Sequence, residues 1–159
     1  MDALLDYGAP SQLPVGTIAV RLALAALFGA VIGIEREWRN RAAGLRTHML
    51  TALSAAVFTV LTGEILFSEV AKSEVAQADP IRVIEAVTSG VAFLAAGAII
   101  QNRDRVRGLT TGAGMWLAGA LGVAAGLGQF VIGALAAVLG LVIIAVIGRL
   151  EGLGKRSGE

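Results

Sequence analysis

Five ionisable side chains lie inside or at the edge of long apolar runs of this sequence. One of these runs, residues 79–100, has fifteen residues without a charge after Glu85, fewer than the roughly 20 that a helix needs to cross a bilayer. A spanning helix must therefore carry Arg82 and Glu85 in its first turns, below the membrane surface, where an unpaired charge is costly. The five side chains are Arg21, Glu64, Asp79, Arg82 and Glu85.

These five charges are expected to pair, because opposite charges in lipid face one another inside a helix bundle. We predict that Arg21 lies within salt-bridge reach of Asp79 or Glu85. Two interpretations of the cluster are open: a polar pocket that binds an ion or passes a proton, and a structural network whose longer side chains reach the headgroups. Magnesium is disfavoured here, because it prefers carboxylates that arginine has not already neutralised.

A second group of residues with possible chemistry lies in two arginine-rich segments. Both contain Gly-Leu-x-Thr, at residues 44–47 and 108–111, just before an apolar run. A helix start presents free N–H groups and a positive dipole end, so such a site favours a phosphate, a nucleotide or an acidic protein. The alternative is that Thr47 and Thr110 are N-caps and that the arginines only mark the cytoplasmic side. The candidates are Glu35, Arg36, Gly44, Arg46, Thr47, Gly108, Thr110 and Thr111.

The composition places these residues in a membrane protein. Of the 159 residues, 56% are hydrophobic and 16% are charged, whereas a soluble domain is about half apolar and a quarter charged. The sequence predicts an all-α membrane protein with five transmembrane helices, at about residues 15–34, 49–67, 80–100, 109–125 and 129–148. Residues 1–14 form an external arm, residues 15–148 the membrane domain and residues 149–159 a cytoplasmic tail. A short surface helix is expected at 68–78, and Pro80 suits a first helical turn.

The distribution of basic residues predicts the orientation. Ten of the thirteen Lys and Arg residues lie in segments 35–48, 102–107 and 149–159, which are therefore cytoplasmic, with the N-terminus outside. Arg21 and Arg82 each precede a glycine by eight residues in helices that enter from outside. Helices 1–2 and 3–4 would then be two hairpins of the same orientation, although coincidence in a compositionally simple chain gives the same pattern.

Several function classes find no support in the sequence. The chain has no cysteine, one histidine and a net charge of +1, so no enzyme activity, cofactor, metal site or nucleic-acid partner is expected. His48 is expected at the membrane interface. Glycine is frequent, with 21 residues, and small residues let membrane helices pack closely, either within the bundle or in a homodimer. The candidate packing residues are Gly29, Gly33, Gly90, Gly97, Gly112, Gly122 and Gly126.

Arg21, five motifs and Gly126-Leu127-Gly128, which together cover about residues 20–130, resemble the MgtC/SapB family of bacterial inner-membrane proteins. The five motifs are GAVIGIERE (29–37), AGLRTHML (43–50), DPIRV (79–83), SGVAFLAAGAI (89–99) and VRGLTTGAGMW (106–116). The resemblance implies five helices, and it implies that Asp79, Arg21 and Arg82 correspond to the family's aspartate and arginines. Ala95 replaces a usual glycine, and Glu85 stands where a neutral residue is more usual. The chain ends after helix 5, so it is expected to belong to the short branch without a soluble C-terminal domain.

The resemblance also implies a role. Members look like non-enzymatic regulators, linked to magnesium limitation, acid stress or virulence, that bind other membrane proteins such as the proton-translocating ATP synthase. The alternative is a small transporter or channel for magnesium, protons or another cation, with the Arg21–Glu85 cluster as its site. A purely structural membrane subunit is a third class.

Overall fold

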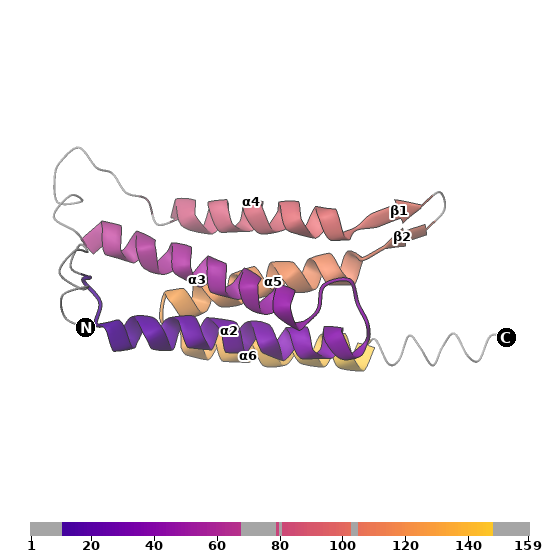
Figure 1. Ribbon diagram of the computed structural model, residues 1–159, viewed down its shortest axis with the longest axis horizontal. Coiled ribbons are helices and arrows are strands. Elements are labelled where there is room, and N and C mark those ends of the chain that lie inside the picture. The colour runs from indigo at the N-terminus through magenta and orange to yellow at the C-terminus, as the bar shows by residue number, and fades with distance from the viewer. Residues whose placement is uncertain (1–10, 68–78, 80, 103–104, 148–159) are drawn as a thin grey trace.

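The computed structural model describes residues 11–67, 79, 81–102 and 105–147. The described chain is a bundle of long helices that lie alongside one another (Figure 1). They are α2 (Val15–Trp38), α3 (Leu45–Phe67), α4 (Ile81–Ala98), α5 (Leu109–Gly126) and α6 (Phe130–Val142), which continues as a π-helix, η1 (Ile143–Ile147). With α6 and η1 taken together, five helices of the described part are long and apolar enough to cross a membrane. The predicted all-α class is confirmed, as are five helices long and apolar enough to cross a membrane.

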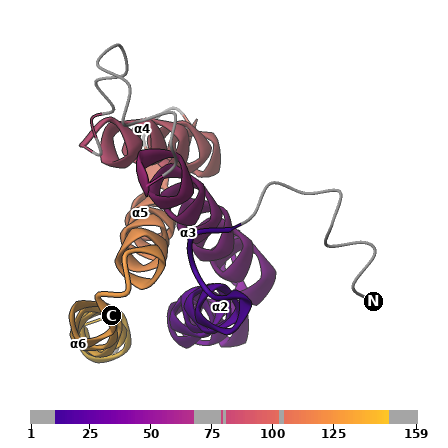
Figure 2. The same ribbon diagram turned by 90° about the vertical axis from the view of Figure 1, so that its left-hand side faces the viewer.

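An end-on view shows how the helices share the bundle (Figure 2). The middle is occupied by α3 and α5, one edge by α2 and α6, and the opposite edge by α4. Burial follows this arrangement, because 56% of the α5 span is buried against 11% of the α4 span. More than half of the residues of α5 are Gly or Ala, so neighbouring helices approach it closely from both sides.

Glycines bring α3 against its neighbours backbone to backbone. A Cβ at Gly29 of α2 would lie 2.5 Å from the carbonyl oxygen of His48, and a Cβ at Gly122 of α5 would collide with the carbonyl oxygen of Ala52. Both contacts therefore require glycine. Of the seven predicted packing glycines, Gly29, Gly33, Gly112, Gly122 and Gly126 face another helix, whereas a Cβ at Gly90 or Gly97 would meet no described atom within 4 Å.

Helices α2 and α3 extend beyond their predicted bounds, and the predicted loop at 35–48 is mostly helical. The helix α2 continues to Trp38, and α3 begins at Leu45 instead of near residue 49. Glu35 and Arg36 are only 8% and 4% exposed. They therefore belong to the packed part of α2, and the helix does not end at them. The remaining turn is closed by Glu37, whose Oε2 accepts a hydrogen bond of 2.9 Å from the N–H of Leu45.

The second arginine-rich connection, predicted as a loop, contains a short antiparallel hairpin. Its strands are β1 (Ile100–Asn102) and β2 (Arg105–Arg107), with Ile100 opposite Arg107. The helix α5 follows Gly108, whose φ of 89° suits glycine and few other residues. Thr110 lies in the first turn of α5, and Thr47 lies in the first turn of α3. Neither threonine is the N-cap, so the prediction that they cap these helices is wrong, whereas the prediction that the arginines mark the cytoplasmic side stays a prediction.

Both arginine-rich connections, α2 to α3 and α4 to α5, lie at the same end of the bundle (Figure 1). We call this the arginine-rich end; the turn from α5 to α6 lies at the opposite end. The internal repeat and the orientation in the membrane stay predictions. The expected surface helix at 68–78, the position of Pro80 and the tail at 149–159 lie outside the described residues, as does most of the N-terminal arm.

The contact at Gly122 predicts the effect of a single added methyl group. Gly122→Ala should force α3 and α5 apart, because the new carbon would collide with the backbone of Ala52. We expect a loss of about 1–3 kcal/mol in the free energy of unfolding, measured by thermal or chemical denaturation in detergent.

Gly63→Ala is the matched control, since a Cβ at this helical glycine meets nothing within 4 Å. It should leave stability unchanged or raise it by up to about 1 kcal/mol. Equal effects of the two variants would contradict the close α3–α5 contact.

Candidate functional site

Arg21 does not join the predicted charge cluster. Its Nη1 donates a hydrogen bond of 2.8 Å to the carbonyl oxygen of Gly126, which ties α2 to the turn between α5 and α6. Among the described residues no ion pair links it to Asp79 or Glu85, so the predicted salt bridge is wrong. The reason is the arrangement of the bundle, because α4 and α2 lie at opposite edges, with α3 and α5 between them (Figure 2).

Two more members of the predicted cluster have local partners. The carboxylate of Glu64 accepts backbone hydrogen bonds from Gln12 at 2.6 Å and from Leu13 at 3.0 Å, so it holds the chain just before α2. Oδ1 of Asp79 accepts a bond of 2.9 Å from the N–H of Ile81, the usual action of an aspartate that caps a helix. Both residues therefore have structural roles at helix ends, and the cluster is not assembled.

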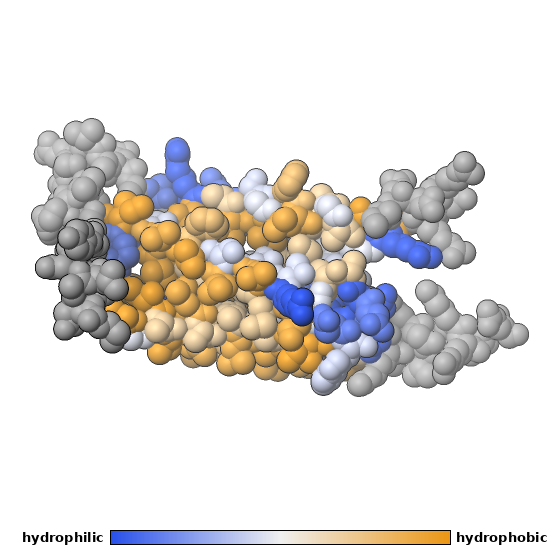
Figure 3. Space-filling model, in the orientation of Figure 1, coloured by the Kyte–Doolittle hydropathy of each residue, from blue (hydrophilic) through white to orange (hydrophobic). Residues whose placement is uncertain are grey.

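The last two members lie on the outer face of α4. Arg82 and Glu85 are exposed, and small residues follow them at helical spacings of three and four. This spacing places them on one side of the helix, opposite the buried Val87, Val91 and Ala95. Figure 3 shows hydrophilic atoms over the start of α4, next to the apolar surface of the bundle. We call this surface the α4 outer stripe; its residues are Arg82, Glu85, Ser89, Ala92 and Ala96.

A groove runs between α3 and α4 on the flank of this stripe. Its volume is about 840 Å³, and its walls are largely apolar, with Phe58 and Leu94 among them. Arg46 and Thr47 lie at its arginine-rich end. The groove exists because α4 packs mainly on α5 and makes few contacts with α3.

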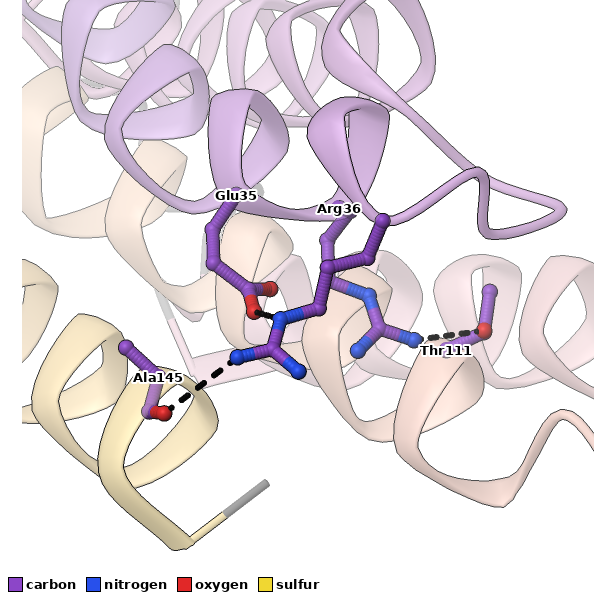
Figure 4. Close-up of polar contacts among 5 residues, drawn as sticks. Glu35, Arg36, Thr111 and Ala145 are labelled. Atoms are coloured by element: carbon purple, nitrogen blue, oxygen red, sulfur yellow. Dashed lines mark hydrogen bonds and ion pairs between the residues drawn. The ribbon is translucent and has the colours of Figure 1, made fainter. Parts of the chain in front are cut away.

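A second cavity, of about 730 Å³, lies at the arginine-rich end between α2, α5 and η1. Nη2 of Arg36 donates a bond of 2.8 Å to Oγ1 of Thr111, and Nε of Arg39 pairs with Oε1 of Glu35 at 2.5 Å (Figure 4). Arg39 also reaches the carbonyl oxygen of Ala145 in η1, at 3.5 Å. We call this cavity the arginine pocket; its polar side chains include Glu35, Arg36, Arg39, Arg41, Arg107 and Thr111.

The structure thus divides the second group of predicted residues. Glu35, Arg36, Gly108, Thr110 and Thr111 line the arginine pocket. Arg46 and Thr47 line the α3–α4 groove instead, and Gly44 lies against the side chain of Glu37. The two Gly-Leu-x-Thr segments therefore do not form one site.

His48 is a residue whose place the sequence did not reveal. It is fully buried instead of interfacial, with Nδ1 2.9 Å from the carbonyl oxygen of Gly44. Its imidazole faces Gly114 of α5, where a Cβ would lie 3.0 Å from Nε2. Glycines on α2 and α5 make room for the imidazole. The sequence would have indicated this burial only if the start of α3 at Leu45, three residues before His48, had been known.

These features can be compared with known proteins. The sequence model of the MgtC family matches residues 22–153, which include α2 from Leu22 onward and the whole of α3, α4, α5, α6 and η1. The chain belongs to the MgtC family. This confirms the resemblance seen in the five motifs. No solved structure matches the chain.

Three relatives illustrate the match. Protein MgtC of Brucella abortus (strain 2308) is 42% identical over 110 residues, which are 69% of this chain and 42% of the relative. YhiD of Escherichia coli K12, whose name describes it provisionally as a magnesium transporter, is 35% identical over 131 residues, 82% of this chain and 60% of the relative. Protein MgtC of Salmonella typhimurium is 42% identical over 104 residues, 65% of this chain and 41% of the relative. The chain therefore spans less than two thirds of each of these MgtC-family relatives.

The separate positions of the two arginines predict different effects of their removal. Arg21→Gln should lose a charge-assisted hydrogen bond between α2 and Gly126, at a cost of about 1–3 kcal/mol. Arg82→Gln removes an exposed side chain and should change stability by less than about 0.5 kcal/mol. Unfolding of the purified protein in detergent measures both changes in stability. Equal losses of stability in the two variants would contradict the separate positions of the two arginines.

Proposed function

We propose that this MgtC-family protein is a non-enzymatic regulator in the bacterial inner membrane that acts by binding another membrane protein through α4. The observation that carries the proposal is the α4 outer stripe, where Arg82 and Glu85 are exposed at the edge of the bundle. Charged side chains at membrane depth are costly unless something pairs with them. The bundle leaves these two charges to an external partner, because Arg21, Glu64 and Asp79, the residues expected to pair with them, bind backbone groups instead.

The stripe is also shaped for a helix. After Arg82 and Glu85 it continues with Ser89, Ala92 and Ala96, and small residues at this spacing let two membrane helices approach closely. A Cβ at Gly90 or Gly97 would meet no described atom within 4 Å, so these positions of α4 are not used to pack the bundle. The occupant we propose is a transmembrane helix of a different protein, with small residues along its contact face and an acid and a base near the end that meets Arg82 and Glu85.

The family likeness supports the wider role of the proposal. On this proposal the protein acts in responses to magnesium limitation, acid stress or virulence, with the proton-translocating ATP synthase as one candidate partner. The alternative of a cation transporter rested on the Arg21–Glu85 cluster. Arg21, Glu64 and Asp79 bind backbone groups instead of one another. The transporter alternative therefore loses its proposed ion site.

Site-specific photocrosslinking in native membranes tests the proposal. A photoreactive amino acid replaces Phe93, which is 81% exposed next to the stripe. We expect a discrete crosslinked product with a second protein. Arg82→Glu should reduce its yield by about tenfold or more, because reversing one charge replaces an attraction with a repulsion.

The same photoreactive residue at Leu135 on α6, which is 61% exposed, is the control. A product at Phe93 no stronger than at Leu135 would contradict the proposal. A product with twice the mass of the chain would also contradict it, because the occupant of α4 would then be a second copy of this protein.

A further inference from the structure

The arginine pocket holds more positive charge than its own residues neutralise. Among the residues that the structure describes, four guanidinium groups line it against one carboxylate, that of Glu35, an excess of three positive charges. The four arginines come from three places in the fold: Arg36 from α2, Arg39 and Arg41 from the turn after it, and Arg107 from β2. Like charges that converge on a concave site attract an anion.

Two buried side chains of the pocket have polar atoms without a partner among the described residues. Arg36 is 4% exposed, and its Nε–H has no acceptor although its Nη2 donates to Thr111. Glu35 is 8% exposed, and its Oε2 has no donor. Both side chains point from α2 into the space between α5 and α6 (Figure 4). Unpaired buried groups are costly, so a ligand that offers both acceptors and a donor fits this place.

The start of α5 adds further donors to the pocket wall. The first N–H groups of a helix have no intrahelical acceptor. Here the N-cap residue, Gly108, has no side chain that could accept from them. These groups, together with the positive end of the helix dipole, favour a negative charge nearby. Gly108 is required here, because a Cβ would collide with the carbonyl oxygen of Ala98 and its φ is positive.

We infer that the arginine pocket binds a phosphate group. Guanidinium groups bind phosphate oxygens in pairs, so Arg36, Arg107 and the start of α5 supply the donors. A singly protonated phosphate also carries a hydroxyl, which can donate to Oε2 of Glu35 while its other oxygens accept. Sulfate lacks this hydroxyl at neutral pH, so the carboxylate favours phosphate over sulfate.

The size of the pocket indicates that the phosphate is part of a larger molecule. Its volume, about 730 Å³, exceeds that of the ion, and Ile143, Ile144 and Ile147 of η1 form an apolar wall. A soluble phosphate ester and an anionic lipid, whose headgroup would lie at this end of the helices, share the phosphate oxygens that the arginines bind. A phosphodiester lipid has no hydroxyl on its phosphorus, so in phosphatidylglycerol a hydroxyl of the glycerol headgroup would donate to Glu35 instead. The inference is independent of the proposed function, because the pocket and the α4 outer stripe have no residue in common.

Binding to the purified full-length protein in a neutral detergent tests the inference. The probes are inorganic phosphate, hexyl phosphate and dihexanoyl phosphatidylglycerol, with sulfate for comparison, followed by calorimetry and by the unfolding temperature. We expect phosphate-bearing probes to bind and to raise the unfolding temperature. The tighter of the ester and the lipid identifies the source of the phosphate.

Three variants separate a built site from diffuse charge. Arg107→Gln changes an exposed side chain, should fold normally and should weaken binding at least tenfold. Arg46→Gln removes an exposed arginine that lines the α3–α4 groove instead and should change the affinity less than twofold. Glu35→Gln should narrow the preference for phosphate over sulfate. Binding of none of the probes, or equal losses in Arg107→Gln and Arg46→Gln, would overturn the inference.

Discussion

The close approach of α3 to α2 and α5 is the constraint on which the rest of the structure depends. Glycines on α2 and α5 meet the backbone of α3 directly, and in a membrane such contacts replace the hydrophobic drive that water would supply. They fix α5 at the centre of the bundle and leave room for the buried imidazole of His48. They also leave α4 only the outer side of α5, so its far face has no partner within the described chain.

Two surfaces follow from this arrangement. At the edge of the bundle, α4 presents charges and small residues on a face that no described helix covers, and this is the surface proposed to bind a partner. At the arginine-rich end, the extension of α2 by one turn brings Glu35 and Arg36 between α5 and η1. The π-helix η1 lies here, and the carbonyl oxygen of its Ala145 accepts a hydrogen bond from Arg39. Such irregular turns are frequent at functional sites.

The sequence predicted where along the chain the helices lie. It did not predict which face of each helix meets which neighbour. Apolar runs and glycine spacing predicted the five helices and the contacts at Gly29 and Gly122. The predicted charge cluster is wrong because it assumed that charges at the same depth along their helices lie close together. The helices that carry Arg21 and Glu85, α2 and α4, lie at opposite edges of the bundle. The end of α2 was placed too early because Glu35 and Arg36 look like loop residues until the cavity that receives them is known. The same holds for His48, whose burial depends on glycines of two other helices.

Disulfide formation between introduced cysteines tests this arrangement most directly, since the chain has no cysteine of its own. A Cβ at Gly119 would lie 3.6 Å from the Cβ of Val91, within the range that a disulfide needs. The pair Val91→Cys and Gly119→Cys should therefore link α4 to α5 on mild oxidation, whereas Arg21→Cys and Glu85→Cys should stay reduced. Rapid oxidation of the Arg21 and Glu85 pair, with none between positions 91 and 119, would contradict the position of α4 at the edge of the bundle.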